Sequence, residues 1–483
     1  MSIMDWSLLI LLILAAVGRG EDLICLTGDT EPYFMFGTKT AYEYANQGIP
    51  TNKLHEVPGC QPLAIWLLNR EGSSNPQADE IADLQQLVNL KANIVTNYRN
   101  GNIRNSNQRI CAVDLDQLER WQWSPQLNQT FAGDLTSEGY LMTEQLAQTW
   151  KNKFPGLLTG NRHDYLFKFP NDKHSKVSFQ AFTEGLFGAN LPPTDAGYGI
   201  PKENDDKLLK PYKLCPKWTK EVEENNSTWA EVDMFKSSWQ YKEMVRNISL
   251  RLGFNYAVDE ATVHRMYQMC RYSKARQVSQ ISPWCAVFSK EDLKRLEYVE
   301  DLETYYKYGY GSQLNQRIGC ALLNEMIEFF NKHIDSELPQ QPLSLVHFTE
   351  APTLLMALTS LGAHRDPAPL AAAAYRAGPA QARRWTTSTM APYSANLAAV
   401  LFKCQKTNFQ NREKYQVLFL ENGQQMYLEG CRVGLCDWSL VRDRFWRPAD
   451  QCRAECNAAA GIKGLYSAIL ASLLILLTKS TLL

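Results

Sequence analysis

The chain reads Leu67-Leu68-Asn69-Arg70-Glu71-Gly72-Ser73-Ser74-Asn75-Pro76 at the point that decides its fold. The apolar run before it, residues 62–68, predicts a buried strand. After it, Asn75 is expected to cap a helix that has Pro76 at its first position. A strand, a tight loop and a helix N-terminus in this order form an anion cradle in α/β proteins. The segment therefore predicts an α/β sheet with such a cradle.

Composition indicates a large globular protein. The chain has 483 residues, of which 45% are hydrophobic, and this length suggests two domains. The formal net charge is -1 and no basic block occurs anywhere, which argues against a nucleic-acid partner.

Both ends of the chain indicate the secretory pathway. An apolar run over residues 6–17, followed by Gly18-Arg19-Gly20, predicts a signal peptide over residues 1–20. Residues 464–477 are continuously apolar but fall short of the roughly 20 residues that span a bilayer as a helix. Small residues at 457–461 precede this run, so we interpret residues 457–483 as a GPI-type signal, the alternative being a short membrane span. We expect an extracellular protein attached to the cell surface by a lipid anchor.

The cysteine content agrees with secretion. All twelve cysteines lie inside the expected mature chain, and in an oxidising compartment they predict disulfides. No histidine lies near the closely spaced pairs, so we expect no metal site, and no cofactor is expected either. Four glycosylation sequons, of which the second and third overlap, are Asn128, Asn225, Asn226 and Asn247.

The pattern of strands and helices predicts two domains. Residues 21–189 and 340–456 form an expected α/β domain, and residues 190–339 form an expected α-helical insertion. Thr136 is expected to cap a helix, a strand is expected over residues 342–348 with a helix from Thr353, and a hairpin is expected around Asn422-Gly423.

Residues 70–76 resemble the R-H-G-x-R-x-P signature of the histidine acid phosphatases, and the chain is most similar to multiple inositol polyphosphate phosphatases. Further similar segments, in the same order along the chain, are residues 36–42, 283–289, 296–302, 305–311 and 391–396. The resemblance implies a parallel sheet flanked by helices, with an inserted helical domain, and phosphomonoesterase activity on inositol polyphosphates. It also implies three disulfides: Cys60–Cys404, Cys270–Cys285 and Cys431–Cys436.

The signature loop departs from the family at its reactive positions. Arg70 is retained as a phosphate-binding arginine, but Glu71 stands where the family has its nucleophilic histidine. Ser74 stands where the family has its second arginine.

The distal positions depart as well. His174 replaces a third arginine, Glu350 replaces the second phosphate-binding histidine, and Pro352 replaces the proton donor. His347 could serve as a displaced histidine only if the motif slipped, which the Thr353-Leu354-Leu355 run argues against. His174 lies in a polar run and is expected to be a solvated loop residue.

These replacements change the electrostatics of the expected pocket. Counting Arg70, Glu71 and Glu350, with neutral His174, gives a formal charge of -1. Two like charges at ~4 Å repel by about 4 kcal/mol at an effective dielectric near 20, so an incoming phosphate is disfavoured. Arg70 is expected to pair with Glu71, because buried charges are retained when paired. A carboxylate pair of Glu71 and Glu350, for acid/base work or for a cation, is a weaker hypothesis.

The sequence therefore predicts a catalytically inactive histidine-phosphatase-fold ectodomain, a pseudophosphatase, that binds an unknown protein or small-molecule partner. The alternative is a phosphomonoesterase acting on inositol polyphosphates, and binding of an inositol phosphate without turnover is disfavoured by the pocket charge. A third hypothesis is an extracellular adhesion module that needs no pocket.

Overall fold

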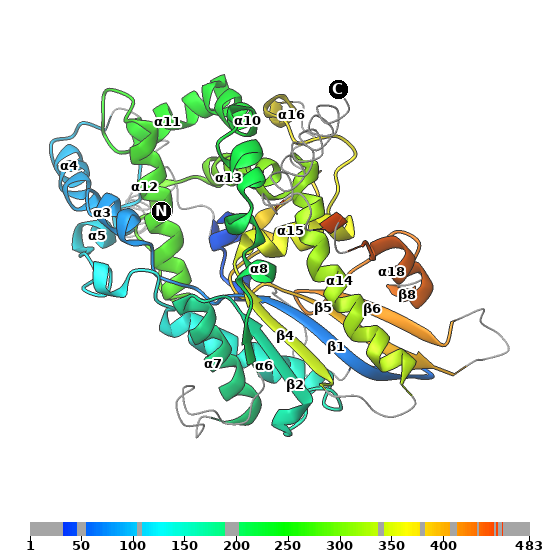
Figure 1. Ribbon diagram of the computed structural model, residues 1–483. Helices are drawn as coiled ribbons and strands as arrows, with labels where there is room; N and C mark the ends of the chain where they lie inside the picture. Colours follow the sequence, from blue (N-terminus) through cyan, green and yellow to red (C-terminus); the bar gives the residue numbers. More distant parts are fainter. Residues whose placement is uncertain are drawn as a thin grey trace, which may run out of the picture.

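The computed structural model describes most of the chain (Figure 1). The described residues are 32–45, 55–103, 109–188, 202–336, 342–376, 382–405, 413–431, 434–448, 451–452 and 456. The expected signal peptide and the expected C-terminal signal lie outside these residues. No helix among the described residues has both the length and the hydrophobicity that crossing a bilayer requires.

One mixed sheet forms the centre of the protein. Its strands in the described residues are β1 (Cys60–Arg70), β2 (Tyr165–Phe169), β3 (Lys202–Asn204), β4 (Ser344–Thr349), β5 (Asn396–Cys404), β6 (Tyr415–Glu421), β7 (Gln424–Gln425) and β8 (Leu435–Asp437). They are ordered β3-β2-β4-β1-β5-β6-β7, with β8 also paired to β6. The strands from β3 to β1 are parallel, and β5 then runs antiparallel to β1. The carboxyl ends of β2, β4 and β1 therefore meet at one edge.

Helices cover both faces of this sheet and build a second, helical part. The α-helices of four or more residues among the described residues are α2 (Tyr42–Ala45), α3 (Ala78–Leu84), α4 (Leu87–Arg99), α5 (Ala112–Arg120), α6 (Ser137–Lys153), α7 (Lys173–Phe187), α8 (Asp206–Leu209), α10 (Asn226–Ser237), α11 (Trp239–Arg251), α12 (Glu260–Arg276), α13 (Lys290–Tyr308), α14 (Gln313–Asp335), α15 (Ala351–Leu361), α16 (Ala372–Arg376), α17 (Thr387–Met390) and α18 (Trp438–Phe445). Short helical turns include η8 (Pro211–Leu214) and α9 (Pro216–Trp218).

The alternation of side chains along β1 explains why the sheet is covered twice. Ile65 and Leu67 pack in the core beneath α6 and α7, whereas Trp66 and Leu68 pack in the core beneath α14 and α15. All four side chains are fully buried. A strand buried on both faces reads as a continuous apolar run, as residues 62–68 do.

The helical part lies beside the sheet and is built from several stretches of chain. In Figure 1, α3, α4 and α5 lie next to α11 and α12, although residues 78–120 were expected in the α/β domain. Conversely, β3 and α14 fall inside residues 190–339, the expected helical insertion. Yet β3 pairs with β2 and α14 packs on β1, so both belong with the sheet. Contacts thus cross the expected boundaries, and the division into residues 21–189 with 340–456 against 190–339 stays a prediction.

Several local expectations can be compared directly. The hairpin forms as expected, because Asn422 (φ 50°) and Gly423 (φ 73°) adopt the left-handed conformation that a tight hairpin turn requires. Thr136 caps α6 by accepting from the Gly139 amide at 2.9 Å. The helix expected from Thr353 begins at Ala351 instead, with Glu350 at its N-cap position.

The expected cap at Asn75 is wrong. Asn75 is buried, its backbone amide donates to Asp134 O at 2.8 Å, and α3 begins only after Gln77. The backbone amide of Gln77 donates to Glu80 at 3.2 Å, as in a capping box. The chain stays extended past Pro76 because it hydrogen-bonds residues 133–136 before it enters the helix.

The three expected disulfides are present. Two further bridges join the C-terminal end of the described chain to the rest: Cys215–Cys456 joins it to the residue after η8, and Cys320–Cys452 joins it to α14. The bridges between described residues are Cys60–Cys404, Cys270–Cys285, Cys431–Cys436, Cys215–Cys456 and Cys320–Cys452. Disulfides are typical of oxidising compartments, so they fit a secreted or lumenal protein.

The expected glycosylation sites differ in exposure. Asn225 and Asn226 are exposed at the start of α10, whereas Asn128 and Asn247 are half-buried. Their modification stays a prediction.

Candidate functional site

The candidate site lies at the carboxyl edge of the parallel strands. Glu71 directly follows β1, Glu350 directly follows β4, and His174 follows β2 in the first turn of α7. Because β2, β4 and β1 are neighbours in the sheet, these three side chains are brought to one place. This edge is where α/β proteins bind ligands.

Arg70 and Glu71 form a buried ion pair. Arg70 Nε lies 3.3 Å from Glu71 Oε1, and both side chains are less than a tenth exposed. The Arg70 guanidinium also donates to Ala391 O at 2.7 Å and to Thr38 O, and it lies over the Tyr393 ring with 4.4 Å to its centroid. The expected pairing of this arginine is therefore confirmed.

Burial is the largest influence on the pKa of Glu71. It raises the pKa of this carboxyl, and the charges of Arg70 and His174 act in the opposite direction without cancelling it. Glu71 Oε2 is buried and has no hydrogen-bond partner among the described residues. This side chain is thus held in a poorly solvated position against its arginine.

The signature loop is held by close backbone packing. A Cβ on Gly72 would lie 2.4 Å from Gly139 O, and a Cβ on Gly139 would lie 2.3 Å from Ser73 O, so only glycine fits at either position. Ser74 forms an isolated antiparallel bridge with Leu135. Its hydroxyl cannot supply the positive charge that the family's second arginine would bring to the loop.

Glu350 is surrounded by donors that the sequence did not reveal. Lys210 Nζ lies 2.8 Å from its Oε1, Lys213 Nζ lies 3.1 Å from its Oε2, and the Tyr212 hydroxyl donates to it. Burial alone would raise the pKa of Glu350, but the hydrogen bonds from His174, Lys210 and Tyr212 hold it well below its usual range. Glu350 is therefore a carboxylate at neutral pH.

The segment that carries these donors, residues 210–213, is anchored by hydrogen bonds to the residue before it, Leu209. Thr349 Oγ1 and Thr353 Oγ1 both donate to Leu209 O, at 2.6 and 2.7 Å, where β4 passes into α15. Leu209 is fully buried, and the Tyr212 ring packs edge-on against Trp218 at 5.4 Å between centroids. These hydrogen bonds and ring contacts hold Lys210, Tyr212 and Lys213 in position beside Glu350.

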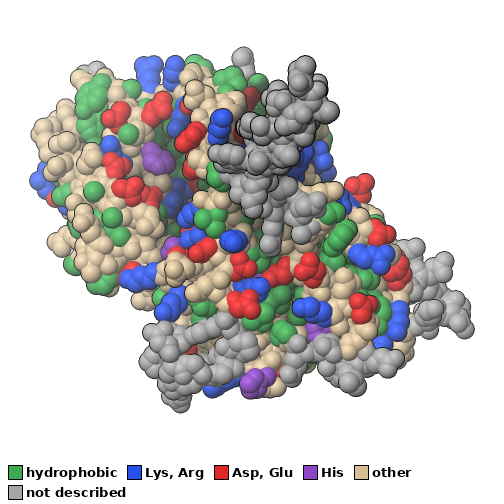
Figure 2. Space-filling model, in the orientation of Figure 1, with side chains coloured by type: hydrophobic (Ala, Val, Ile, Leu, Met, Phe, Trp, Pro, Cys, Tyr) green, Lys and Arg blue, Asp and Glu red, His purple; other side chains and the backbone are tan. Residues whose placement is uncertain are grey.

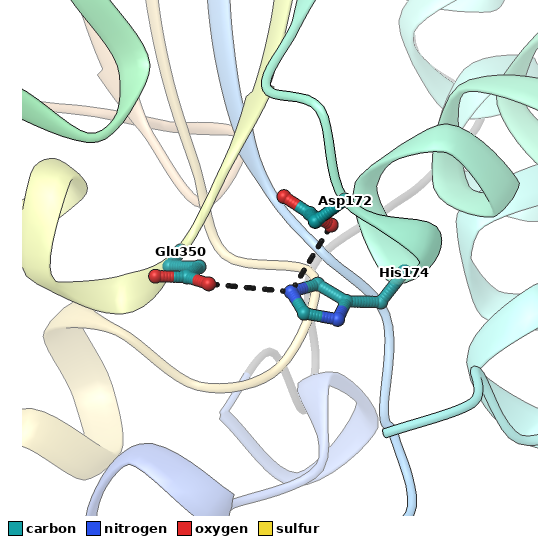
Figure 3. Close-up of side chains that lie close together, drawn as sticks. All are labelled: Asp172, His174 and Glu350. Atoms are coloured by element: carbon teal, nitrogen blue, oxygen red, sulfur yellow. Dashed lines mark hydrogen bonds and ion pairs between the residues drawn. The ribbon is translucent and has the colours of Figure 1, made fainter. Parts of the chain in front are cut away.

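His174 is not the solvated loop residue that was expected. Its Nε2 lies 3.2 Å from Asp172 Oδ1 and 3.4 Å from Glu350 Oε1 (Figure 3), and only 16% of its side chain is exposed. Burial alone would lower the pKa of His174, but the hydrogen bond to Glu350 and the charges of Glu71 and Asp172 outweigh it and raise the pKa. The expectation failed because Asp172 caps α7 through the Ser175 amide, which places His174 in the first turn.

Pro352 lies at the start of α15. A proline in the first turn is compatible with a helix, since the amides there have no partner within the helix. The ring carries no titratable proton, so this position supplies no acid. The helix N-terminus that follows Glu350 favours a negative charge at that residue.

His347 lies away from this cluster. It is fully buried within β4, where its Nε2 lies 2.7 Å from Glu325 Oε2 on α14 and its Nδ1 lies 3.2 Å from Leu67 O. It therefore serves the contact between the sheet and α14, in agreement with the unslipped motif.

A second ion pair, between Glu300 and Arg271, contacts Thr38, whose carbonyl accepts from Arg70. Glu300 on α13 accepts from the Thr38 amide at 2.8 Å and pairs with Arg271 on α12, which also donates to Phe36 O at 3.0 Å. Although burial alone would raise the pKa of Glu300, the charges of Arg271 and Lys39 lower it to about 2. These contacts join residues 36–42 to residues 296–302, two segments on which the resemblance rests.

The charge of the site is not the -1 that was expected. Lys210, Lys213 and Asp172 are added by the structure, and together with Arg70, Glu71 and Glu350 they make the site formally neutral when His174 is neutral. Figure 2 shows the same intermixing over the described part of the visible face, where acidic and basic side chains alternate. The cations in the site are held by the protein's own carboxylates.

One group of side chains could hold a metal ion. The ligand atoms of Asp172, His174 and Glu350 all lie within 4.8 Å of one another (Figure 3). However, Lys210 Nζ already lies 2.9 Å from Asp172 Oδ2 and 2.8 Å from Glu350 Oε1. An ammonium between these two carboxylates opposes a second cation, so the arrangement resembles a salt-bridge network more than a metal site.

Comparison with known proteins identifies the family. Residues 71–420 match the histidine phosphatase superfamily (branch 2), so the chain belongs to this superfamily and the expected family is confirmed. Multiple inositol polyphosphate phosphatase 1 of Drosophila melanogaster is 33% identical over 97% of this chain and 99% of its own length. Multiple inositol polyphosphate phosphatase 1 of Homo sapiens is 29% identical over 89% of each chain.

Solved structures agree on the fold. The phytase from D. castellii aligns with a TM-score of 0.67 and 17% identity, over 87% of each chain. The Bifidobacterium longum multiple inositol polyphosphate phosphatase in complex with inositol hexasulfate aligns with a TM-score of 0.61 and 12% identity, over 86% of this chain and 98% of its own. The expected α/β fold of this family is confirmed.

Proposed function

We propose that this protein is a pseudophosphatase: a histidine-phosphatase fold that does not hydrolyse phosphomonoesters and acts by binding a ligand or a partner. One observation carries the proposal. Glu71, at the family's nucleophile position, is buried and ion-paired to Arg70, the one signature-loop arginine that the chain retains.

The chemistry of the fold supports this proposal. Phosphomonoester hydrolysis by a histidine phosphatase uses an imidazole nucleophile, a cationic cage and an acid that protonates the leaving oxygen. Glu71 offers a carboxyl in place of the imidazole, and Pro352 offers no proton at all. Removing one preorganised donor typically lowers a rate by ~10²–10³, and here several groups are replaced together.

The electrostatics of the site support it as well. Lys210 and Lys213 have the charge that could bind phosphate, but Glu350 and Asp172 already neutralise them. A phosphate that entered would have to displace these carboxylates or lie against them. Anion binding is therefore disfavoured, although the site no longer carries the net negative charge expected from the sequence.

The alternative is a phosphomonoesterase that acts on inositol polyphosphates, as the names of the relatives suggest. His174 is the feature that favours it, because its pKa is raised and a cationic imidazole would replace part of the missing arginine charge. This alternative still lacks a nucleophile other than Glu71.

Phosphate release from inositol hexakisphosphate tests the proposal. The purified chain is assayed between about pH 4 and pH 8, since catalytic pKa values are tuned to the working pH. The Drosophila relative, produced in the same way, serves as the positive control. We expect no release above the blank. Release that is lost in both Glu71→Gln and Glu350→Gln variants contradicts the proposal and assigns a carboxylate-dependent mechanism.

A further inference from the structure

A cavity in the helical part of the protein shares no lining residue with the candidate site. It has a volume of about 680 Å³ and is lined by the end of α5, the loop over residues 121–127, the second half of α12 and the loop over residues 277–283. Figure 1 shows α5 and α12 in the helical part of the molecule. All lining residues belong to the described stretches 109–188 and 202–336, so the cavity is formed by described chain alone.

The lining of this cavity is polar, but its hydrogen-bonding groups are mostly uncharged. Five glutamines and four serines contribute to it, and none of the described residues that line it is acidic. Its two arginines already have partners: Arg120 Nη2 lies 3.0 Å from Asp116 Oδ1, and Arg276 Nη2 donates to Gln126 Oε1. The cavity therefore offers amide and hydroxyl groups to a ligand rather than a free charge.

Two of the lining residues have an unsatisfied polar atom. Ser282 is 2% exposed, and its hydroxyl has no hydrogen-bond partner among the described residues. Gln117 Oε1 is likewise buried without such a partner. Buried polar atoms nearly always have a hydrogen-bond partner, and leaving one unpaired costs stability. Serine and glutamine side chains reach other rotamers at modest cost, so both groups can turn toward a ligand in the cavity that they line.

The walls of the cavity are fixed before any ligand binds. The Cys270–Cys285 disulfide joins α12 to the end of the second loop, and the Cys285 amide donates to Ser282 O at 3.0 Å. In the first loop, the Trp121 ring packs perpendicular to the fully buried Trp284 ring, with 5.2 Å between centroids. Preorganised walls lower the entropic cost of binding.

We propose that this cavity binds a neutral saccharide. Sugar hydroxyls both donate and accept hydrogen bonds, as serine hydroxyls and glutamine amides do, so the two sets of groups are complementary. Trp121 and Ile281 supply apolar surface for the C–H faces of a sugar ring. The volume lies within the ~300–1,000 Å³ typical of small-molecule sites. An ionic ligand would lack a free counter-charge in this lining. The proposal does not depend on the pseudophosphatase proposal.

Saturation-transfer NMR titration of the full chain tests the proposal, with lactose, chitotriose and sialyllactose as probes. We expect saturable binding of lactose or chitotriose at one site per chain. The affinity should be the same at about 0.05 M and about 0.5 M salt, because salt screens only charged ligands. Sialyllactose, which adds a carboxylate to lactose, should bind no more tightly than lactose.

Variants of the two unsatisfied groups locate the binding. Ser282→Ala and Gln117→Leu should each weaken binding by about threefold to tenfold, because each removes one hydrogen bond to the ligand. Neither should lower the urea midpoint of the free protein, since each removes a polar group that has no partner. Ser237→Ala and Gln145→Leu change the same residue types at exposed positions outside the cavity and should leave the affinity unchanged.

Three results overturn the proposal. One is the absence of binding of both neutral probes. Another is binding that is equally tight in the cavity variants and in the two control variants. The third is binding that weakens with salt or strongly prefers sialyllactose, which would identify an anion site instead.

Discussion

Replacing Glu350 by glutamine should destabilise the protein by about 2–3 kcal/mol at neutral pH. Removing one partner from a buried pair typically costs ~3–5 kcal/mol, whereas an exposed pair is worth about 0–1 kcal/mol. Glu350 and Lys210 keep 16% and 12% of their side chains exposed, and Asp172 remains as a partner of Lys210, which places the cost below the buried range. Lys213 is 49% exposed and adds little.

The effect should depend on pH in a defined direction. The pKa of Glu350 is held well below its usual range in the folded protein, so its contribution is fully present above the unfolded pKa near 4.5. It is lost as the pH falls below that value toward the folded pKa. The difference between the native chain and Glu350→Gln should therefore be largest at neutral pH and should shrink in acid.

Urea unfolding with intact disulfides, followed by tryptophan fluorescence, measures this difference at about pH 7 and about pH 3.5. Glu224→Gln is the matched control, since Glu224 is exposed and a surface change stays within about 0.5 kcal/mol. Two results would refute the reasoning. One is a Glu350→Gln variant as stable as the control at neutral pH, and the other is a difference that is equally large at both pH values.

Three further predictions concern the rest of the chain. Glu71→His alone should not restore phosphate release from inositol hexakisphosphate, because the other replaced positions remain; release at a rate near that of the Drosophila relative would contradict this. Replacing both Cys60 and Cys404 by serine should cost about 2–4 kcal/mol in urea unfolding, since the bridge closes a loop between β1 and β5, and unchanged stability would count against it. Treatment of expressing cells with a phosphatidylinositol-specific phospholipase should release the protein, whereas retention with Leu483 still detectable would indicate a membrane span instead.

Local features of the fold could be predicted from the sequence. The run before Arg70 is apolar at successive positions, as in a strand that is buried on both faces. Thr136 has a hydroxyl that can cap a helix, and Asn422 and Gly423 are residue types that tolerate positive φ. Each of these depends on a few neighbouring residues, so no knowledge of distant contacts was needed. The cap at Asn75 failed because residues 133–136, far along the chain, bind the loop and delay the helix.

The candidate site was predictable in position but not in composition. Family resemblance placed Glu71, His174 and Glu350, and the parallel strands bring them together. Lys210 and Lys213 are 140 and 137 residues from Glu350 in the sequence, and no motif marks them. A charge count from the motif positions alone was therefore bound to miss the cations that neutralise Glu350.

The Cys215–Cys456 bridge has a mechanical consequence for this site. Cys215 directly follows η8, the turn that carries Tyr212 and Lys213. A pulling force applied at Cys456, the last described residue, would be shared between this bridge, which leads into η8, and the Cys320–Cys452 bridge, which leads into α14. If the protein is tethered at its C-terminus, part of the tension on the tether would thus act directly on the segment that contacts Glu350.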